Sequence, residues 1–371
     1  MGVNFWFIYV ICALVIAFFI YTKHNKTTEV MFVIYSFLMW FVGSFRYGIG
    51  NDFFTYKSLY ENLMNPNYPS QYLEPAFRCY VFVLNYISVD VQVLFVLYIT
   101  LTLFFVYRGA KYYFPDKRYY ILFLLLYFLA FNGGYTVSFN IMRQSLAMAI
   151  IFYSTRYVLE RNISKFIVFV FFAFINHYSA ILFMFLYFLP KFKIGLRKSF
   201  VCIMIFMLVF LSPLGSVVID SFITGPFLNG LGYGGYVSKI QMANVEEDMG
   251  VNFATVFLTL LYLFGAMVND KYDKSEILVC NASFIYILMR IVADVRMDNH
   301  MVHMLFQRIS IYLSLLYFVF IVRSIPKVAY VLNVKKMEYA ISLIIVLLFS
   351  SALLLAIYTN EFYNPYKMFD F

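Results

Sequence analysis

Long apolar runs separated by short polar stretches dominate the pattern of this 371-residue chain. Most runs approach or exceed the ~20 residues that a helix needs to cross a ~30 Å hydrocarbon layer, and they are too long for transmembrane strands. We therefore predict roughly 11–12 transmembrane helices in a single domain over residues 1–371. The predicted spans are 4–22, 29–45, 75–88 with 91–107, 119–134, 143–159, 164–189, 199–219, 251–268, 274–293, 304–322 and 337–358.

The composition excludes a soluble globular protein. Hydrophobic residues make up 63% of the chain and charged residues 13%, with a mean hydropathy of +0.80. Soluble domains normally contain about a quarter charged residues. A chain this apolar is expected to cover much of its surface with lipid, so the predicted fold class is an all-α, polytopic integral membrane protein.

The basic residues predict an orientation, because the cytoplasmic loops of membrane proteins collect Lys and Arg. Six connections hold 19 of the 28 basic residues, and we expect them to be cytoplasmic: 23–28, 108–118, 156–165, 191–198, 269–276 and 323–336. The long loops 46–74 and 212–252 then face outward as extracytoplasmic loops. Loop 212–252 is too long for an ordinary connector, which favours either a lid over the substrate or a disordered segment.

Two segments do not fit this alternation simply. If all the basic loops are cytoplasmic, 75–107 crosses the membrane an odd number of times and 164–189 an even number. We expect 75–107 to be a half-helix in the outer interface followed by one full span. Residues 164–189 are too few for two crossings, which predicts either a broken or re-entrant pair hinged near Asn176–His177, or one tilted helix with a local exception to the charge rule.

The polar stretch that follows the span 29–45 is the first candidate for chemistry. It places Arg46 and Asp52 where the chain leaves the bilayer, and a charge next to hydrocarbon costs free energy unless a partner or a charged ligand meets it. Gly48 and Gly50 would let this loop turn tightly and approach a ligand.

Arginine is also enriched on the predicted outward face. The cytoplasmic loops hold 6 Arg and 13 Lys, whereas the rest of the chain holds 3 Lys and 6 Arg, at positions 46, 78, 143, 290, 296 and 308. Orientation needs only positive charge, but the planar guanidinium binds phosphate through two parallel hydrogen bonds. The pattern therefore predicts a phosphate site. The alternative is that these arginines extend to the interface or pair with Glu74, Asp294 and Asp298.

Arg143 and Arg308 have the most suggestive settings among these arginines. Each begins an apolar span at a predicted outward helix end, and Gln144 follows Arg143 directly. Helix N-termini carry partial positive charge and free amide groups, so an arginine there makes an anion site.

His177 is a third candidate, within the polar island Asn176-His177-Tyr178-Ser179 of an otherwise apolar segment. Imidazole is well suited to take a proton from a hydroxyl near neutral pH, although a lone histidine in an apolar helix commonly just bonds to a neighbour. His300 and His303, in a predicted outward loop, are weaker candidates. No metal-ligand spacing occurs and the four cysteines are scattered, so no metal, cofactor or disulfide is indicated.

Taken in order, these motifs resemble the EpsG family, which comprises Wzy-type polymerases of bacterial O-antigens, capsules and exopolysaccharides. Each motif is unspecific by itself, and the resemblance rests on their order over about 320 residues. The matching residues are Arg46-Tyr-Gly48-Ile-Gly50-Asn-Asp52 with Tyr56, Asn140-Ile-Met-Arg143-Gln144 with Ala147, Phe172-Ala173-Phe-Ile-Asn-His177-Tyr-Ser179-Ala180, Arg308 with Tyr312, and Asn364-Pro365-Tyr366.

The resemblance implies a glycosyltransferase of the bacterial inner (cytoplasmic) membrane, with a GT-C-like fold and an active site that faces outward. Its substrates would be two undecaprenyl-diphosphate lipids, a donor carrying the growing glycan and an acceptor carrying one repeat unit. Membrane lipid and a polysaccharide chain-length regulator are further implied partners, and no nucleic acid is expected.

Within that activity we expect three arginines, Arg46, Arg143 and Arg308, to bind the diphosphate or stabilise it as it leaves. His177 is the expected general base, with Asp52 as its rival. Gln144, Tyr56 and Tyr312 are expected to contact phosphate or sugar, although packing explains the tyrosines nearly as well. The alternatives are a lipid-linked oligosaccharide flippase, a membrane O-acyltransferase, or a ligase that shares this chemistry and differs only in its acceptor.

Overall fold

The computed structural model describes most of the chain, and its described part is built from helices connected by short turns. Described are residues 2–21, 25–65, 73–131, 133–212, 215, 253–269, 273–295, 300–333 and 337–359. The predicted loop 212–252, apart from residues 212 and 215, lies outside these ranges, as do Arg296, Asp298 and the motif Asn364-Pro365-Tyr366.

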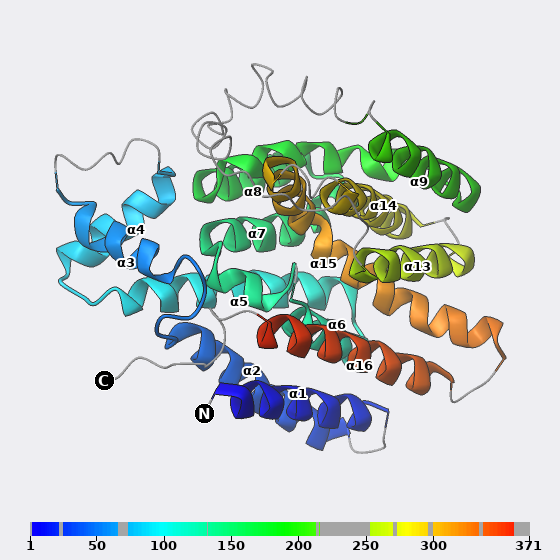
Figure 1. Cartoon of the computed structure of the whole chain (residues 1–371), viewed down its shortest axis with the longest axis horizontal. Helices are drawn as coiled ribbons and strands as arrows, with labels where there is room; N and C mark the ends of the chain where they lie inside the picture. The colour runs from blue at the N-terminus through cyan, green and yellow to red at the C-terminus, as the bar shows by residue number, and fades with distance from the viewer. Residues whose placement is uncertain are drawn as a thin grey trace. The chain divides into compact units, whose positions relative to one another are not determined.

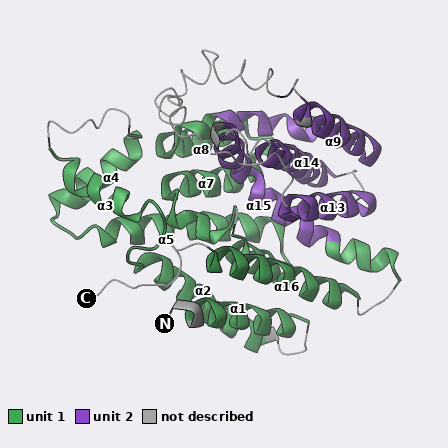
Figure 2. Ribbon diagram, viewed as in Figure 1, with its two compact units in different colours: residues 1–181, 325–371 green, residues 182–324 purple. Residues whose placement is uncertain are grey.

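The chain forms two compact units, residues 1–181 with 325–371 (unit 1) and residues 182–324 (unit 2) (Figure 2). Most of the helices belong to unit 1: α1 (Gly2–Phe19), α2 (Asn25–Ser44), α3 (Phe53–Asn62), α4 (Pro75–Tyr86), α5 (Gln92–Tyr113), α6 (Lys117–Leu129), the 3-10 turn η2 (Tyr135–Phe139), α7 (Met142–Leu159), α8 (Ile163–Asn176) and α16 (Met337–Tyr358). Unit 2 contains η4 (Leu189–Lys191), α9 (Leu196–Leu211), α13 (Phe253–Val268) and α14 (Lys274–Val295). Two elements continue from one unit into the other, η3 (Tyr178–Tyr187) and α15 (His300–Val331).

The predicted class, an all-α polytopic membrane protein, is confirmed. Within the described ranges, five helices are long and apolar enough to cross a membrane: Lys26–Ser44, Gln92–Tyr113, Lys274–Val295, Val302–Val331 and Met337–Tyr358. On α2, large apolar side chains at 30, 33, 34 and 37 are all more than half exposed, which is the one-sided stripe expected of a helix facing lipid.

The two segments with an irregular predicted topology are interrupted where the sequence indicated. In 75–107, the short helix α4 ends before Ser88, which has a φ of 54°, and the long helix α5 then begins. In 164–189, α8 ends at Asn176, His177 has extended backbone, and the 3-10 helix η3 follows. The predicted break near Asn176–His177 is therefore confirmed, while the number of times that 164–189 crosses the membrane stays a prediction.

Helix α7 occupies the centre of unit 1 and positions the candidate site. It packs against α5 and against α8 (Figure 1), and nearly all of its residues are buried, including the hydroxyl-bearing Ser145, Ser154 and Thr155. The Thr155 hydroxyl is hydrogen-bonded to Tyr113 of α5 at 2.8 Å. Because α7 is buried along most of its length, Arg143 at its first turn has a well-defined position.

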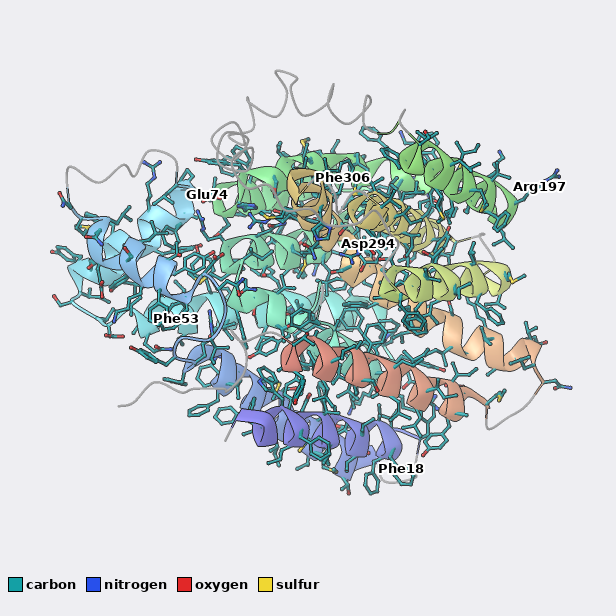
Figure 3. All side chains as sticks on the ribbon, in the orientation of Figure 1. Phe18, Phe53, Glu74, Arg197, Asp294 and Phe306 are labelled. Carbon is teal, nitrogen blue, oxygen red and sulfur yellow. The ribbon has the colours of Figure 1, made fainter. Side chains whose placement is uncertain are left out.

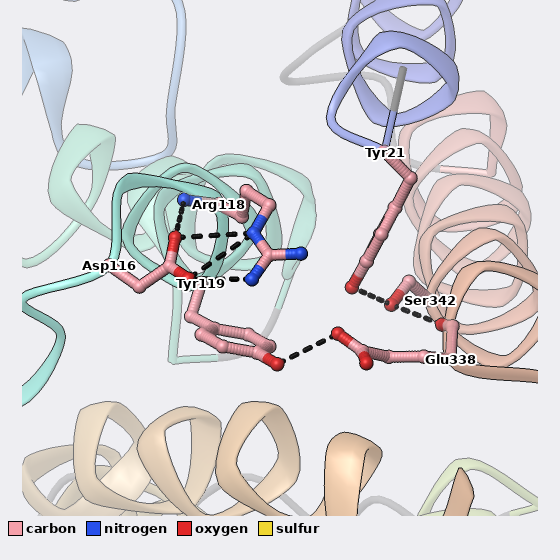
Figure 4. Close-up of polar contacts among 6 residues, drawn as sticks. All are labelled: Tyr21, Asp116, Arg118, Tyr119, Glu338 and Ser342. Atoms are coloured by element: carbon pink, nitrogen blue, oxygen red, sulfur yellow. Dashed lines mark hydrogen bonds and ion pairs between the residues drawn. The ribbon is translucent and has the colours of Figure 1, made fainter. Parts of the chain in front are cut away.

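Polar contacts join three helices of unit 1 at their ends, close to loops that we predict to be cytoplasmic (Figure 4). The hydroxyl of Tyr119 on α6 donates to Glu338 of α16 at 2.8 Å, and Tyr21, after α1, is hydrogen-bonded to Ser342 of α16 at 2.8 Å. Asp116 caps α6 by accepting from the backbone N–H of Arg118 at 2.9 Å. These contacts hold α1, α6 and α16 together.

Candidate functional site

The loop after α2 is built around Arg46. Its side chain has no exposed surface, and its guanidinium lies between two aromatic rings, 4.7 Å from the centroid of Phe95 and 4.8 Å from that of Phe139. The Nη1 group donates to the carbonyl of Gly43. Stacking on two ring faces and a backbone carbonyl stabilise a cation that would otherwise be costly to bury.

Gly48 and Gly50 allow the loop to turn tightly directly after Arg46. Gly48 has a φ of 62° and Gly50 a φ of 93°, a region that other residues rarely adopt. A Cβ atom on Gly50 would lie 2.7 Å from the carbonyl oxygen of Phe139. Next to it, the backbone N–H of Asn51 donates to the side chain of Asn140 at 2.7 Å. The loop is thus fastened to the segment that leads into α7.

Glu74, labelled in Figure 3, makes two polar contacts with residues of other segments of unit 1. It precedes Pro75, and a proline disfavours helical backbone in the residue before it, so Glu74 stays extended and α4 starts directly afterwards. Its side chain makes no capping bond and is only 5% exposed. One oxygen, Oε2, accepts from Nη1 of Arg143, and the other, Oε1, is 2.6 Å from Nδ1 of His177. Two groups that lie 69 and 103 residues further along the chain therefore meet on one buried carboxylate.

His177 reaches Glu74 because α8 ends immediately before it. The backbone N–H of His177 still donates to Ala173, but its φ of −159° and ψ of 119° take the chain out of the helix. The Nδ1 atom faces the carboxylate, whereas the buried Nε2 atom has no hydrogen-bond partner within the described ranges. Glu74 thus holds the imidazole ring through Nδ1.

Arg143 is the second residue of α7, where helix amides carry partial positive charge, and the Glu74 carboxylate lies close to that helix end. The guanidinium lies 5.2 Å from the Phe77 ring and 5.8 Å from the Tyr56 ring, and 21% of the side chain is exposed. Its Nε atom makes no hydrogen bond to the described residues. Arg143 is therefore bonded to Glu74 through Nη1 and lies beside the Tyr56 hydroxyl, with about a fifth of its side chain exposed.

The charges of Arg143 and Asp52 shift the pKa values of Glu74 and Tyr56. Burial works to raise the pKa of Glu74, but the hydrogen bond to His177 and the charge of Arg143 outweigh it, so that the pKa is lowered and Glu74 is ionised near neutral pH. Burial raises the pKa of Tyr56, while the nearby Arg143 charge works in the opposite direction and the Asp52 carboxylate adds to the increase. Tyr56 thus remains a neutral hydroxyl next to the cation.

The structure brings together several of the predicted site residues within unit 1. Arg143 and His177 meet on Glu74, Tyr56 lies beside Arg143, and Asp52 precedes α3 and acts on Tyr56 through its charge. The loop of Arg46, Gly48 and Gly50 contacts the approach to α7, and Gln144 is buried next to Arg143 in the sequence.

Two predicted residues, Arg308 and Tyr312, belong to unit 2 and lie on α15. Tyr312 is buried and stacks on Phe183, with ring centroids 4.3 Å apart. In the same unit Arg290 pairs with Asp294 at 3.4 Å within α14, both side chains being buried. The alternative that some of these arginines pair with acidic residues is confirmed for Arg290 and for Arg143.

Glu74 was not among the residues predicted to be functional and was named only as a possible partner of an arginine. The available signal was its position, as an acidic residue directly before Pro75 at the start of an apolar run. Its two contacts depend on tertiary structure and leave no spacing in the sequence. Within the described ranges, no group of three or more His, Cys, Asp and Glu side chains could hold a metal ion.

A comparison with family models identifies the chain. The model of the EpsG family matches residues 29–368, nearly the whole sequence. This chain belongs to the EpsG family. EpsG proteins are similar to Wzy-type polymerases, so membership indicates a membrane protein of polysaccharide biosynthesis, similar to polysaccharide polymerases. No curated protein and no solved structure matches the chain.

Proposed function

We propose that this protein is a bacterial polysaccharide polymerase that joins repeat units carried on undecaprenyl diphosphate, at the outward face of the inner membrane. The growing glycan is transferred from its lipid diphosphate to a hydroxyl of the repeat unit on a second lipid diphosphate. Membership of the EpsG family supports the reaction class. The single observation that carries the assignment to particular residues is the meeting of Arg143 and His177 on the buried carboxylate of Glu74.

In the proposed reaction, the bond between the anomeric carbon and the diphosphate oxygen breaks while a new bond forms from that carbon to the acceptor oxygen. The departing diphosphate gains negative charge, and the guanidinium of Arg143 stabilises it there. A preorganised donor of this kind contributes ~3 kcal/mol to lowering a barrier. The acceptor hydroxyl gives its proton to Nε2 of His177, the ring nitrogen without a partner in the described structure.

The remaining predicted residues support these two in the proposal. Arg46 has no exposed surface, so we assign it, with Gly48 and Gly50, to holding the loop against the segment before α7. Tyr56 lies next to Arg143 and is assigned to orienting a phosphate or sugar oxygen. Asp52 remains the rival general base.

The substrate contacts predicted for Arg308, Tyr312 and Gln144 stay predictions, and the first two residues belong to unit 2. Arg308 is half-buried on α15, and its guanidinium has the chemistry to bind a phosphate. Substitution of Arg308 by lysine in the assay described next tests this role separately from that of Arg143.

The test is polymerisation by the purified protein in lipid vesicles supplied with synthetic undecaprenyl-diphosphate repeat units. We expect a ladder of glycans, which His177→Ala and Arg143→Ala abolish, while Arg197→Ala, at an exposed arginine of α9, leaves it intact. Asp52→Ala separates the two candidate bases, because only loss of the true base removes the ladder. An unchanged ladder from His177→Ala or Arg143→Ala would remove that residue from the site, and products formed from a nucleotide sugar alone would overturn the proposed donor.

A further inference from the structure

We propose that Glu74 is a positioning residue for glycosyl transfer, which fixes the tautomer of His177 and the direction of Arg143 at the same time. The role of Glu74 in glycosyl transfer rests on the proposed function. Its contacts with His177 and Arg143 do not depend on the substrate. It concerns a residue that the motifs of the sequence do not include.

The hydrogen bond between Glu74 and His177 determines which ring nitrogen carries the proton. An ionised carboxylate is a pure acceptor, so Nδ1 of the ring, 2.6 Å from Oε1, must carry the proton. In a neutral imidazole the other nitrogen is then unprotonated, which makes Nε2 the basic atom. Glu74 therefore decides which ring nitrogen can receive the proton of an acceptor hydroxyl. A base held by a carboxylate through its second nitrogen is a recurrent arrangement in enzymes that activate hydroxyl groups.

The two oxygens of Glu74 each contact a different residue. Because Oε1 faces His177 and Oε2 faces Arg143, rotation of the carboxylate would disturb both contacts. The backbone is restrained by Pro75, and the side chain is 5% exposed, so water competes little for either oxygen. The carboxylate is thus a rigid link between the group proposed to stabilise the leaving diphosphate and the group proposed to take the proton.

The negative charge of Glu74 also affects both residues. A neutral side chain in place of Glu74 could still accept a bond from His177, but it would leave the Arg143 cation without its counter-charge. It would also tolerate the opposite tautomer, since an amide can donate to Nδ1 as well as accept from it. Both effects act on the geometry of the reacting groups, and neither requires Glu74 to touch the substrate.

The experiment compares Glu74→Gln with Glu74→Asp and with a matched control, Glu61→Gln. Glu61 lies on α3 of the same unit, its side chain is 56% exposed, and it lies 3.9 Å from Lys57, a described residue on the same helix. We expect Glu74→Gln to lower kcat for chain elongation by about a hundredfold or more, the range for general acid–base catalysis, with KM changed less than about threefold. Glu74→Asp, which keeps the carboxylate, should restore part of the rate. The control should match the wild type.

A second readout separates positioning from a purely structural role. In protein labelled with ¹⁵N-histidine, the nitrogen shifts report which ring nitrogen carries the proton, and the His177 signals are those lost in His177→Ala. We expect the wild type to carry the proton on Nδ1, and Glu74→Gln to show the other tautomer or a mixture. A wild-type proton on Nε2, or identical tautomers and kinetics in Glu74→Gln, would overturn the inference.

The two readouts also separate this inference from the proposed function. If the wild-type protein makes no ladder but Glu74→Gln changes the His177 tautomer, then the polymerase assignment fails and the positioning by Glu74 stands. If the wild type makes a ladder and Glu74→Gln makes it at the same rate, then the polymerase assignment stands and the positioning fails.

Discussion

Replacing Arg143 by lysine tests the proposed leaving-group role most informatively. The substitution keeps the positive charge beside Glu74 and so avoids leaving a buried carboxylate without a partner, which typically costs ~3–5 kcal/mol. What it removes is the planar fork of donors. Arg143 contacts Glu74 through Nη1 while Nε has no partner within the described structure. Lysine has a single nitrogen, which cannot hold Glu74 and a phosphate with comparable geometry.

The expected magnitude follows from that difference. Loss of one preorganised donor to a developing negative charge costs about 2–4 kcal/mol, which corresponds to a roughly 30- to 1,000-fold lower rate. The stability of the protein should change little, because the charge that neutralises Glu74 remains. Both kcat and kcat/KM should fall together if the interaction forms mainly in the transition state.

The assay measures initial rates of chain elongation in vesicles, together with thermal unfolding of the same preparations. Arg197→Lys, at an exposed position of α9, is the matched control. A rate for Arg143→Lys within about threefold of the wild type, with unchanged thermal stability, would refute the assignment of the leaving-group charge to this guanidinium.

Three further predictions concern neighbouring residues. Gly50→Ala should destabilise unit 1 and lower activity, because the added Cβ would lie 2.7 Å from the Phe139 carbonyl at a φ of 93°. Thermal unfolding and elongation rates check this. The control is Gly195→Ala, where an added Cβ meets no atom within 4 Å. The pKa of Glu74 is lowered on folding, so its ionisation stabilises the folded protein. This contribution is complete above the unfolded pKa of about 4.5 and is lost as the pH falls through the lower folded pKa. Below pH 4.5 the melting temperature of Glu74→Gln should therefore fall less steeply with decreasing pH than that of the wild type. Tyr56→Phe should lower kcat/KM by about tenfold through loss of one hydroxyl contact of ~1.4 kcal/mol, and an unchanged value would show that this tyrosine only packs.

Local sequence signals were sufficient to predict the class of the protein and several backbone features. The length and apolar character of the runs determine the helical membrane fold, since few other structures satisfy backbone hydrogen bonds in lipid. The break at Asn176–His177 and the turn at Gly48 and Gly50 are also local, because a polar island and two glycines mark them directly.

The partners of the charged residues could not be predicted in the same way. The sequence indicated that Arg143 and His177 carry chemistry, but not that one carboxylate joins them, because Glu74 lies 69 and 103 residues away from them in the chain. Both Arg46 and Arg143 were likewise predicted from the sequence to bind the diphosphate. Only tertiary packing separates them, since Phe95 and Phe139 cover Arg46 completely whereas a fifth of Arg143 is exposed.

The central claim is that Arg143 and His177 act within one site, and the most direct measurement is kcat/KM for Arg143→Lys, His177→Ala and the variant carrying both. Residues that act on the same step as a unit show strongly non-additive losses. We therefore predict that the combined variant loses far less than the product of the two single losses. A combined loss equal to that product would contradict the account, because it would mean that the two residues contribute independently.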